Sequence, residues 1–306
     1  MRILFAGTPV NAAVTLRELV KCGFEISAVL TREDAAVGRA KTLTPSAVAL
    51  AAEELGIPVI KSNRVDDQTL VEIRSYRVDL GVVVAYGSLL KQEALAALSS
   101  GWLNLHYSLL PKYRGAAPVQ WAIRNGEVLT GVTLFKLDQG MDTGPILSSV
   151  EVEIQPEETS GELLVRLTHI GVSVLSDALP LIASGLATYT NQPAEGSLAP
   201  KLTRSDARVD WSRSAKQIEQ QVRAMNPEPM AWCEFQNNPV RIIAARAHSS
   251  GSKLPIGTVF REGADVLVAC GDSTSLMLLH VQPAGKNEMT ANSWANGLKS
   301  LEVKLG

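Results

Sequence analysis

The sequence predicts an α/β protein of two domains, with a Rossmann-like first domain on a mostly parallel sheet and a smaller, OB-like β-barrel after it. Its 306 residues exceed the size at which one hydrophobic core usually stops growing. Up to about residue 184, short apolar runs alternate with longer amphipathic segments, as in successive βαβ units. Beyond a polar stretch at residues 189–200, short apolar segments are separated by turn residues.

The first βαβ unit carries clear start and stop signals. Residues 2–6 are an apolar run that predicts a strand, and Thr8 and Pro9 supply an N-cap and a first helical residue with a preset φ. The amphipathic segment that follows can end at Gly23, and residues 25–30 predict the second strand. A strand, a helix and a strand in this order favour parallel pairing.

The same signals recur further along the chain. Thr44 and Pro45 repeat the helix start, Gly56 supplies the stop, and residues 58–60 predict a third short strand. Residues 78–85 are nearly all apolar, which is typical of a strand covered by helices on both faces. The first domain is therefore predicted to be a layered α/β domain.

Residues 189–200 are rich in Pro, Gly and Ser, which is typical of a linker. We expect residues 1–188 to form the first domain, residues 189–206 the linker and residues 207–306 the second domain. The elements predicted beyond the linker are a helix at residues 213–225 and strands at residues 230–235, 240–247, 257–260, 266–270 and 275–281.

Composition describes an ordinary folded protein. Charged residues make up 20% of the chain and the formal net charge is -2, without the basic excess of many nucleic-acid binders. Cys22, Cys233 and Cys270 form no CxxC motif, so we expect neither a disulfide framework nor a metal site. The N-terminus lacks signal-peptide features, and the most apolar run, residues 80–90, is too short to span a membrane. We expect a cytoplasmic protein without a membrane anchor.

Three polar residues form a candidate catalytic set. Asn104 and His106 are two positions apart near the end of a predicted strand, so their side chains emerge on one face. Asp142 lies in a glycine-flanked loop after another strand-like run. An amide can stabilise an oxyanion, a histidine can move a proton near neutral pH, and a carboxylate can orient the imidazole. The same residues are also compatible with simple backbone capping and an ordinary turn.

A wider pattern favours the catalytic interpretation. The chain resembles the folate-dependent formyltransferases in Asn104, His106, the run Ser108, Leu109, Leu110 and Pro111, the pair Arg114 and Gly115, and the triplet Asp142, Thr143 and Gly144. The resemblance implies that Asn104, His106 and Asp142 are catalytic. It also implies transfer of a formyl group from 10-formyltetrahydrofolate to an amine, without a metal.

The resemblance further implies where the folate lies. The segments that match folate-holding parts are Ser108, Leu109, Leu110 and Pro111, and the loop of Ala85, Tyr86 and Gly87. Without the resemblance, these would be an ordinary loop and an ordinary turn. Gly7 and Gly87 follow predicted strands, at the edge where open α/β sheets bind ligands. A nicotinamide cofactor is disfavoured because the GxGxxG pattern is missing.

The formyl acceptor is inferred from features outside the catalytic segment. Residues 31–44 predict a long polar loop, which resembles the loop of the family members that act on methionyl initiator tRNA. The resemblance implies tRNA contacts by Arg39 and Lys41, with Arg32 nearby, and by Lys201 at the entry to the second domain. Without the resemblance, these residues would be interpreted as solvated surface charges that contact nothing. We expect no obligate protein partner.

The resemblance extends over essentially the whole chain, with some departures. Val10 and Asn11 replace an acidic residue and a phenylalanine, and Glu228 and Met230 replace tryptophan and glycine. Transfer to methionyl initiator tRNA is thus the leading hypothesis. An amino-sugar N-formyltransferase with the same folate donor is the alternative enzyme, and an RNA-binding protein that keeps the fold without catalysis is the alternative from another class.

Overall fold

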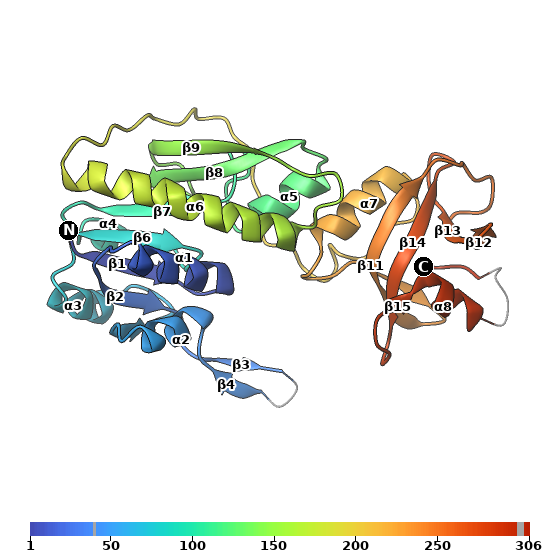
Figure 1. Cartoon of the computed structure of the whole chain (residues 1–306), viewed down its shortest axis with the longest axis horizontal. Coiled ribbons are helices and arrows are strands. Elements are labelled where there is room, and N and C mark those ends of the chain that lie inside the picture. The colour runs from blue at the N-terminus through green and yellow to red at the C-terminus, as the bar shows by residue number, and fades with distance from the viewer. Residues whose placement is uncertain (39–40, 299–302) are drawn as a thin grey trace. The chain divides into compact units, whose positions relative to one another are not determined.

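A seven-stranded sheet forms the centre of the first part of the computed structural model, which describes residues 1–38, 41–298 and 303–306 (Figure 1). The strand order is β5-β2-β1-β6-β7-β8-β9. The first five strands in this order, β5, β2, β1, β6 and β7, pair in parallel. Strand β8 pairs antiparallel with β7, and β9 pairs antiparallel with β8. The strands are β1 (Ile3–Gly7), β2 (Ile26–Thr31), β5 (Val59–Lys61), β6 (Leu80–Val84), β7 (Trp102–His106), β8 (Leu129–Lys136) and β9 (Ile146–Glu153). The mostly parallel sheet predicted from the sequence is confirmed.

Helices cover both faces of this sheet. On one face, Trp102 packs into an apolar cluster that includes residues of α3 and α4, and its indole N–H donates to the carbonyl of Ala94 at 2.8 Å. On the opposite face, Leu105 contacts α6 so closely that a Cβ at Gly171 would lie 2.5 Å from its side chain. The helices of this unit are α1 (Val10–Lys21), α2 (Ala47–Glu54), α3 (Asp67–Ser75), α4 (Gln92–Leu95) and most of α6 (Ser160–Ala183), while α5 (Pro118–Arg124) belongs almost wholly to the second unit.

Two predicted helix starts are wrong in detail. The N-cap of α1 is Pro9, without a side-chain cap, because the Thr8 hydroxyl instead donates to the carbonyl of Tyr86 at 2.9 Å. The N-cap of α2 is Ser46, whose hydroxyl accepts the N–H of Ala49 at 3.0 Å. A serine directly before the first helical residue can reach an otherwise unsatisfied donor of the first turn, which the earlier Thr44 cannot do.

The predicted long loop at residues 31–44 contains regular structure. It includes the short strands β3 (Ala35–Val37) and β4 (Thr42–Thr44), which pair in an antiparallel hairpin whose described residues are exposed. The expectation of a loop without secondary structure was therefore wrong. Backbone pairing within the hairpin satisfies hydrogen-bonding groups that water would otherwise have to solvate.

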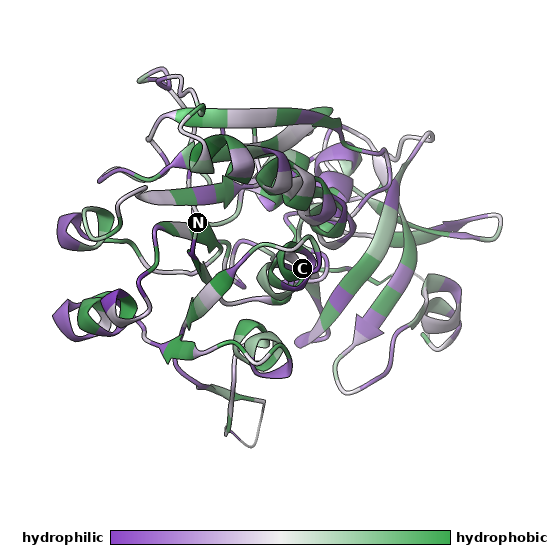
Figure 2. Cartoon of the chain, turned by 60° about the vertical axis from the view of Figure 1, so that its left-hand side comes forward, coloured by the Kyte–Doolittle hydropathy of each residue, from purple (hydrophilic) through white to green (hydrophobic). Residues whose placement is uncertain are grey.

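The second part of the structure is built on an antiparallel sheet of order β10-β11-β14-β13-β12, with β15 paired to β14. Hydrophobic and hydrophilic residues alternate along its long strands, as Figure 2 shows. A capping box between Ser214 and Gln217 starts helix α7, close to the predicted helix. The elements are α7 (Ala215–Ala224), α8 (Ala291–Asn296), β10 (Trp232–Phe235), β11 (Asn238–His248), β12 (Val259–Glu262), β13 (Asp265–Ala269), β14 (Ser275–Pro283) and β15 (Met289–Thr290).

The chain divides into two compact units. The first unit comprises Met1–Pro118, Leu129–Glu153 and Leu164–Pro200, and the second comprises Val119–Val128, Ile154–Leu163 and Lys201–Gly306. The second unit thus takes in two segments that precede the predicted linker in the chain. The domain boundaries derived from composition stay a prediction.

Helix α6 is long and apolar enough, by length and composition alone, to cross a membrane. Its contact with Leu105 shows that at least part of its apolar surface packs against β7. Helices at the centre of globular proteins share these properties, because a helix that covers a sheet is apolar over much of its surface. The apolar composition of α6 is therefore explained by its packing against the sheet.

Candidate active site

A cavity of about 400 Å³ lies in the first unit, within the size range typical of small-molecule sites. Its walls come from the segment that follows β6, from the end of β7, from residues 115–118 and from the loop that follows β8. Asn104, His106 and Asp142 all line it, so the structure brings the three predicted catalytic residues to one place. Polar and apolar walls in one partly open cavity suit a ligand with a flat ring and a reactive polar end.

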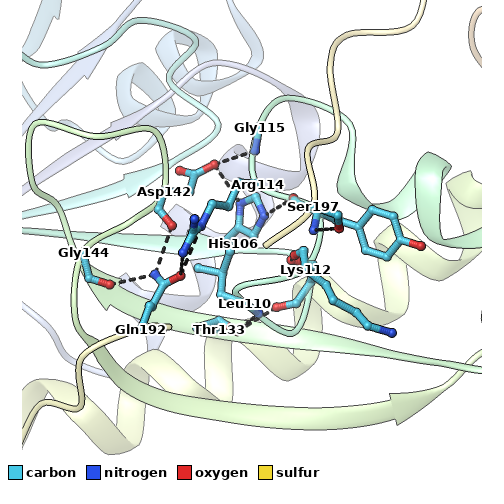
Figure 3. Close-up of polar contacts among 12 residues, drawn as sticks. His106, Leu110, Lys112, Arg114, Gly115, Thr133, Asp142, Gly144, Gln192 and Ser197 are labelled. Atoms are coloured by element: carbon cyan, nitrogen blue, oxygen red, sulfur yellow. Dashed lines mark hydrogen bonds and ion pairs between the residues drawn. The ribbon is translucent and has the colours of Figure 1, made fainter. Parts of the chain in front are cut away.

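His106 is the last residue of β7 and is 5% exposed. Its Nε2 atom lies 2.8 Å from the carbonyl oxygen of Tyr113 (Figure 3). Because a carbonyl can only accept, Nε2 carries the proton in the neutral ring and Nδ1 keeps a lone pair. The free lone pair at Nδ1 can accept a proton.

Burial and charge act in opposite directions on His106. Desolvation lowers the pKa of the imidazole below its usual 6.5, while the Asp142 carboxylate and the Tyr113 carbonyl both act to raise it. Burial has the largest effect, so the ring is neutral at neutral pH. A neutral imidazole beside a carboxylate is ready to take up a proton and be stabilised as a cation.

Asp142 is fixed by the loop that carries it. Its Oδ2 atom lies 3.7 Å from Nδ1 of His106 and accepts the backbone N–H of Gly115 at 2.7 Å. The residue has a φ of 54°, in the left-handed region that aspartate tolerates better than most residues. A Cβ at Gly144 would lie only 1.8 Å from the carbonyl oxygen of Lys136, so this close approach requires glycine.

Asn104 occupies the centre of β7, between Val83 of β6 and Phe135 of β8. It shares a face of the sheet with His106 and lines the cavity. Among the hydrogen bonds of the described residues, none involves its side-chain amide. The amide N–H groups are therefore available to a ligand in the cavity.

The loop of Ala85, Tyr86 and Gly87 lines the cavity as well. Ala85 has a φ of 50° and Gly87 a φ of 84°, so the chain turns sharply directly after β6. The Tyr86 hydroxyl donates to the carbonyl of Ser62 at 2.7 Å, and burial raises the pKa of this phenol to about 12. The loop is thus a fixed wall of the cavity.

Arg32 contacts the loop that follows β6. Its guanidinium donates to the carbonyl of Gly87 at 2.5 Å and to the side chain of Asn63 at 3.2 Å. These bonds hold the loop after β6, so Arg32 supports the wall of the cavity. The guanidinium has five N–H donors, so these bonds leave donors over, and the expected contact of Arg32 with tRNA phosphates stays a prediction.

The run Ser108, Leu109, Leu110 and Pro111 is not among the residues that line the cavity. It is held in place by Thr133 of β8, whose hydroxyl donates to the carbonyl of Ser108 at 2.7 Å and lies 3.2 Å from the backbone nitrogen of Leu110. The Ser108 hydroxyl donates within the same turn, to the carbonyl of Lys112 at 2.6 Å. The part of these four residues in folate binding stays a prediction.

The residues expected to meet tRNA lie in both units. Lys41 is exposed at the turn of the hairpin of β3 and β4, and Lys201 is exposed at the start of the last segment of the second unit. Arg39 lies outside the described residues. The roles of all three stay predictions.

Sequence reasoning missed several residues that shape the site. The backbone of Tyr113 and Gly115 contacts His106 and Asp142, and the side chains of Arg114 and Gln192 contact one another beside them. Arg114 and Gly115 belong to the pattern that the chain shares with formyltransferases, but the pattern assigned them no role. Gln192 lies in the predicted linker, where no signal distinguished it.

Comparison with known proteins extends the resemblance to nearly the whole chain. The formyl transferase family matches residues 1–179, and the formyl transferase C-terminal domain matches residues 201–299. Methionyl-tRNA formyltransferase of an Arthrobacter species is 44% identical over 302 residues, which cover 99% of this chain and 98% of the relative. That of Acidothermus cellulolyticus is 45% identical over 317 residues and covers 98% of each. The chain belongs to the methionyl-tRNA formyltransferase family.

Solved structures show the same fold at lower identity. HypX from Aquifex aeolicus, solved in complex with tetrahydrofolic acid, is 19% identical with a TM-score of 0.64, over 96% of this chain and 47% of that one. The sugar 3N-formyl transferase WlaRD, solved in the presence of dTDP and 5-N-formyl-THF, is 19% identical with a TM-score of 0.65, over 94% of this chain and 99% of that one. At such identities the likeness is one of fold alone.

Proposed function

We propose that this chain moves the formyl group of 10-formyltetrahydrofolate to the α-amino group of methionine on initiator tRNA. The observation that carries the proposal is the meeting of Asn104, His106 and Asp142 at one cavity. The relatives that match the whole chain are named for this activity. We infer that the enzyme works in the cytoplasm, where initiator tRNA is used.

The chemistry begins with attack of the uncharged amine on the formyl carbon. A carbon–nitrogen bond forms, and the carbonyl electron pair moves to oxygen. The Asn104 amide donates to this developing oxyanion, an interaction worth roughly 2.7 to 4 kcal/mol at comparable sites. The amide suits this role because none of the described protein groups competes for its N–H donors.

Proton transfer completes the reaction. The attacking amine loses a proton as the new bond forms, and the folate N10 gains one as its bond to the formyl carbon breaks. Neutral His106 takes up the proton at Nδ1, and Asp142 at 3.7 Å stabilises the resulting imidazolium. The ring then returns the proton to the departing nitrogen, so that atoms and charge balance over the cycle.

The cavity fits a folate in size and lining. Its volume of about 400 Å³ is lined by apolar side chains such as Leu89, Leu90 and Leu137, which suit a flat ring system. The sharp turn from Ala85 to Gly87 places main-chain groups at its wall. Neighbours of the same fold were solved in complex with tetrahydrofolic acid and in the presence of 5-N-formyl-THF, which supports a folate as the formyl donor.

A transfer assay tests the proposed function. Purified protein is mixed with 10-formyltetrahydrofolate and methionyl initiator tRNA, and formylmethionyl-tRNA is measured. Parallel reactions replace the tRNA with a dTDP-linked amino sugar, the class of compound with which an N-formyltransferase of similar fold was solved in complex. His106→Ala is the catalytic variant, and His169→Ala, at an exposed position on α6, is its matched control.

We expect transfer to tRNA by the wild type and by His169→Ala, and its loss in His106→Ala. Transfer to the amino sugar and none to tRNA would replace the proposed acceptor while leaving the catalytic residues in place. Failure with both acceptors, alongside a control enzyme that works on the same substrates, would overturn the assignment.

A further inference from the structure

Residues 190–199, which we call the strap, form hydrogen bonds along the edge of the active site. Arg114 and the strap exchange backbone bonds, since the Arg114 N–H donates to Ser197 at 2.8 Å and the Ala199 N–H donates to Arg114 at 2.7 Å. The Ser197 hydroxyl also accepts the N–H of Tyr113 at 2.9 Å. The strap therefore fixes the path of residues 113–115.

Residues 113–115 hold both members of the catalytic pair. The Tyr113 carbonyl accepts from His106, and the Gly115 N–H donates to Asp142. A Cβ at Gly115 would lie 2.8 Å from the carbonyl oxygen of Ala199, so the backbone of the strap lies directly against this turn. A shift of the strap would move the partners of His106 and Asp142 together.

Gln192 links the strap to the Asp142 loop directly (Figure 3). Its side-chain amide donates to the carbonyl of Asp142 at 3.0 Å and to that of Gly144 at 2.7 Å. Its Oε1 atom accepts from the buried guanidinium of Arg114 at 2.9 Å. Arg114 fixes the orientation of the amide, because only the oxygen end can accept from a guanidinium.

We propose that Gln192 is a positioning residue, which holds the Asp142 carboxylate at the distance from His106 that formyl transfer requires. The proposal rests on the proposed function and assigns a catalytic consequence to a segment that composition marked as a linker. Gln192 acts through Asp142 and is not among the residues that line the cavity. The side-chain amide nitrogen of Gln192 donates to two carbonyls of the Asp142 loop, so this one side chain ties the strap to that loop at two points.

The electrostatics of His106 provide a readout for this role. Asp142 is the charged side chain that acts to raise the pKa of the imidazole, against the effect of burial. The Arg114 guanidinium donates to Gln192, Pro193 and Ala194, and Phe135 of β8 presents an apolar ring to the imidazole. A displaced Asp142 would therefore lower the pKa of His106 further.

The first test compares Gln192→Ala with Asn191→Ala, which removes the same kind of amide from the exposed neighbouring residue. We expect Gln192→Ala to lower kcat/KM roughly 10- to 100-fold, because small displacements of catalytic groups have effects of this size. Asn191→Ala is expected to stay close to the wild type. Equal activity in the two variants would overturn the proposal.

A double-mutant cycle separates positioning from a general loss of stability. In an Asp142→Asn background the group that Gln192 positions is already gone, so Gln192→Ala should have little further effect on kcat/KM. A purely structural role predicts the same fold-loss in both backgrounds. Full additivity of the two substitutions would therefore contradict the assignment.

The last measurement does not depend on the acceptor. The chain has four histidines, so the imidazole signal of His106 can be assigned by NMR through its loss in His106→Ala. We expect its pKa to be lower in Gln192→Ala than in the wild type, and lower still in Asp142→Asn. An unchanged pKa in Gln192→Ala would overturn positioning, whereas an altered pKa in a protein that transfers no formyl group would leave positioning intact and remove the proposed function.

Discussion

The carboxylate oxygen of Asp142 lies 3.7 Å from Nδ1 of His106 while it accepts the Gly115 N–H, so a backbone group fixes the side chain that we propose stabilises the imidazolium. The bond from Gly115 removes much of the rotational freedom of the carboxylate. Catalytic groups that are held in advance lose little entropy when the transition state forms. The pair can thus act without rearrangement of the loop.

Asp142→Asn should keep the fold and lose most of the activity. The asparagine oxygen can still accept from Gly115, but the negative charge that favours protonated His106 is gone. We expect kcat/KM to fall by about 100-fold or more, within the range of general acid–base contributions. Initial rates of formylmethionyl-tRNA formation measure the effect. Asp177→Asn, at an exposed position of α6, is the control, and similar rates in the two variants would rule out the electrostatic role.

Asn104→Ala should reduce turnover without weakening folate binding. Asn104 lines the cavity, and its amide is expected to donate only once the oxyanion develops. Loss of one such donor typically lowers kcat by about 10² to 10³-fold. Single-turnover rates are measured beside equilibrium binding of 5-formyltetrahydrofolate. A variant that loses folate affinity and keeps its single-turnover rate would show that Asn104 serves binding instead.

The stability of the protein should fall in mild acid because of His106. The pKa of the buried ring is lowered below 6.5, so below that pH the unfolded chain takes up a proton that the folded protein does not. Stability is therefore full above pH 6.5 and declines as the pH falls toward the lowered pKa, by at most about 1.4 kcal/mol per pH unit. Urea unfolding at pH 7.5 and 5.5 measures this slope.

The control for this slope is again a histidine variant. His106→Gln should show a smaller loss of stability between the two pH values than the wild type, whereas His169→Gln should match the wild type. Equal slopes in all three proteins would mean that other groups cause the acid sensitivity.

Much of the fold followed from local sequence patterns. The strands at residues 2–6, 25–30 and 78–85 were correctly predicted because buried parallel strands are almost entirely apolar. The helix caps were less predictable, since the Thr8 hydroxyl bonds Tyr86, which is 78 positions away in the sequence. In the sequence, a threonine before a proline gives the same pattern whether its hydroxyl caps a helix or forms such a long-range hydrogen bond.

The candidate site also has features that local sequence patterns predicted and features that they could not predict. The two-residue spacing of Asn104 and His106 on a strand predicted their shared face, and the structure has both at one cavity. The contact of Asp142 with Gly115 depends on two loops meeting in space, which the sequence does not encode locally. Gln192 could not be found for a further reason, because its polar surroundings resemble those of any flexible linker.

Thr133→Val tests whether the run from Ser108 to Pro111 holds the folate. The substitution keeps the shape of the side chain but removes the hydroxyl that binds the Ser108 carbonyl and the Leu110 backbone nitrogen. Buried groups left without partners cost about 1 to 3 kcal/mol, so the run should loosen. If these residues contact the pterin, the Kd for 5-formyltetrahydrofolate rises, as measured by equilibrium dialysis. Thr130→Val, on the same strand, is the control, and an unchanged Kd in Thr133→Val would place the folate on the cavity walls alone.

Lys41→Ala and Lys201→Ala test whether phosphate contacts come from both units of the chain. Each exposed lysine that neutralises a phosphate releases a counterion, so its loss should raise the KM for tRNA and flatten the dependence of log KM on log salt by about one. The value of kcat should stay unchanged, because neither lysine is among the residues that line the cavity. Lys253→Ala removes an exposed charge of the second unit that has no expected RNA contact. If Lys253→Ala changes the salt dependence as much as the other two, binding rests on net charge, and these lysines are not specific tRNA contacts.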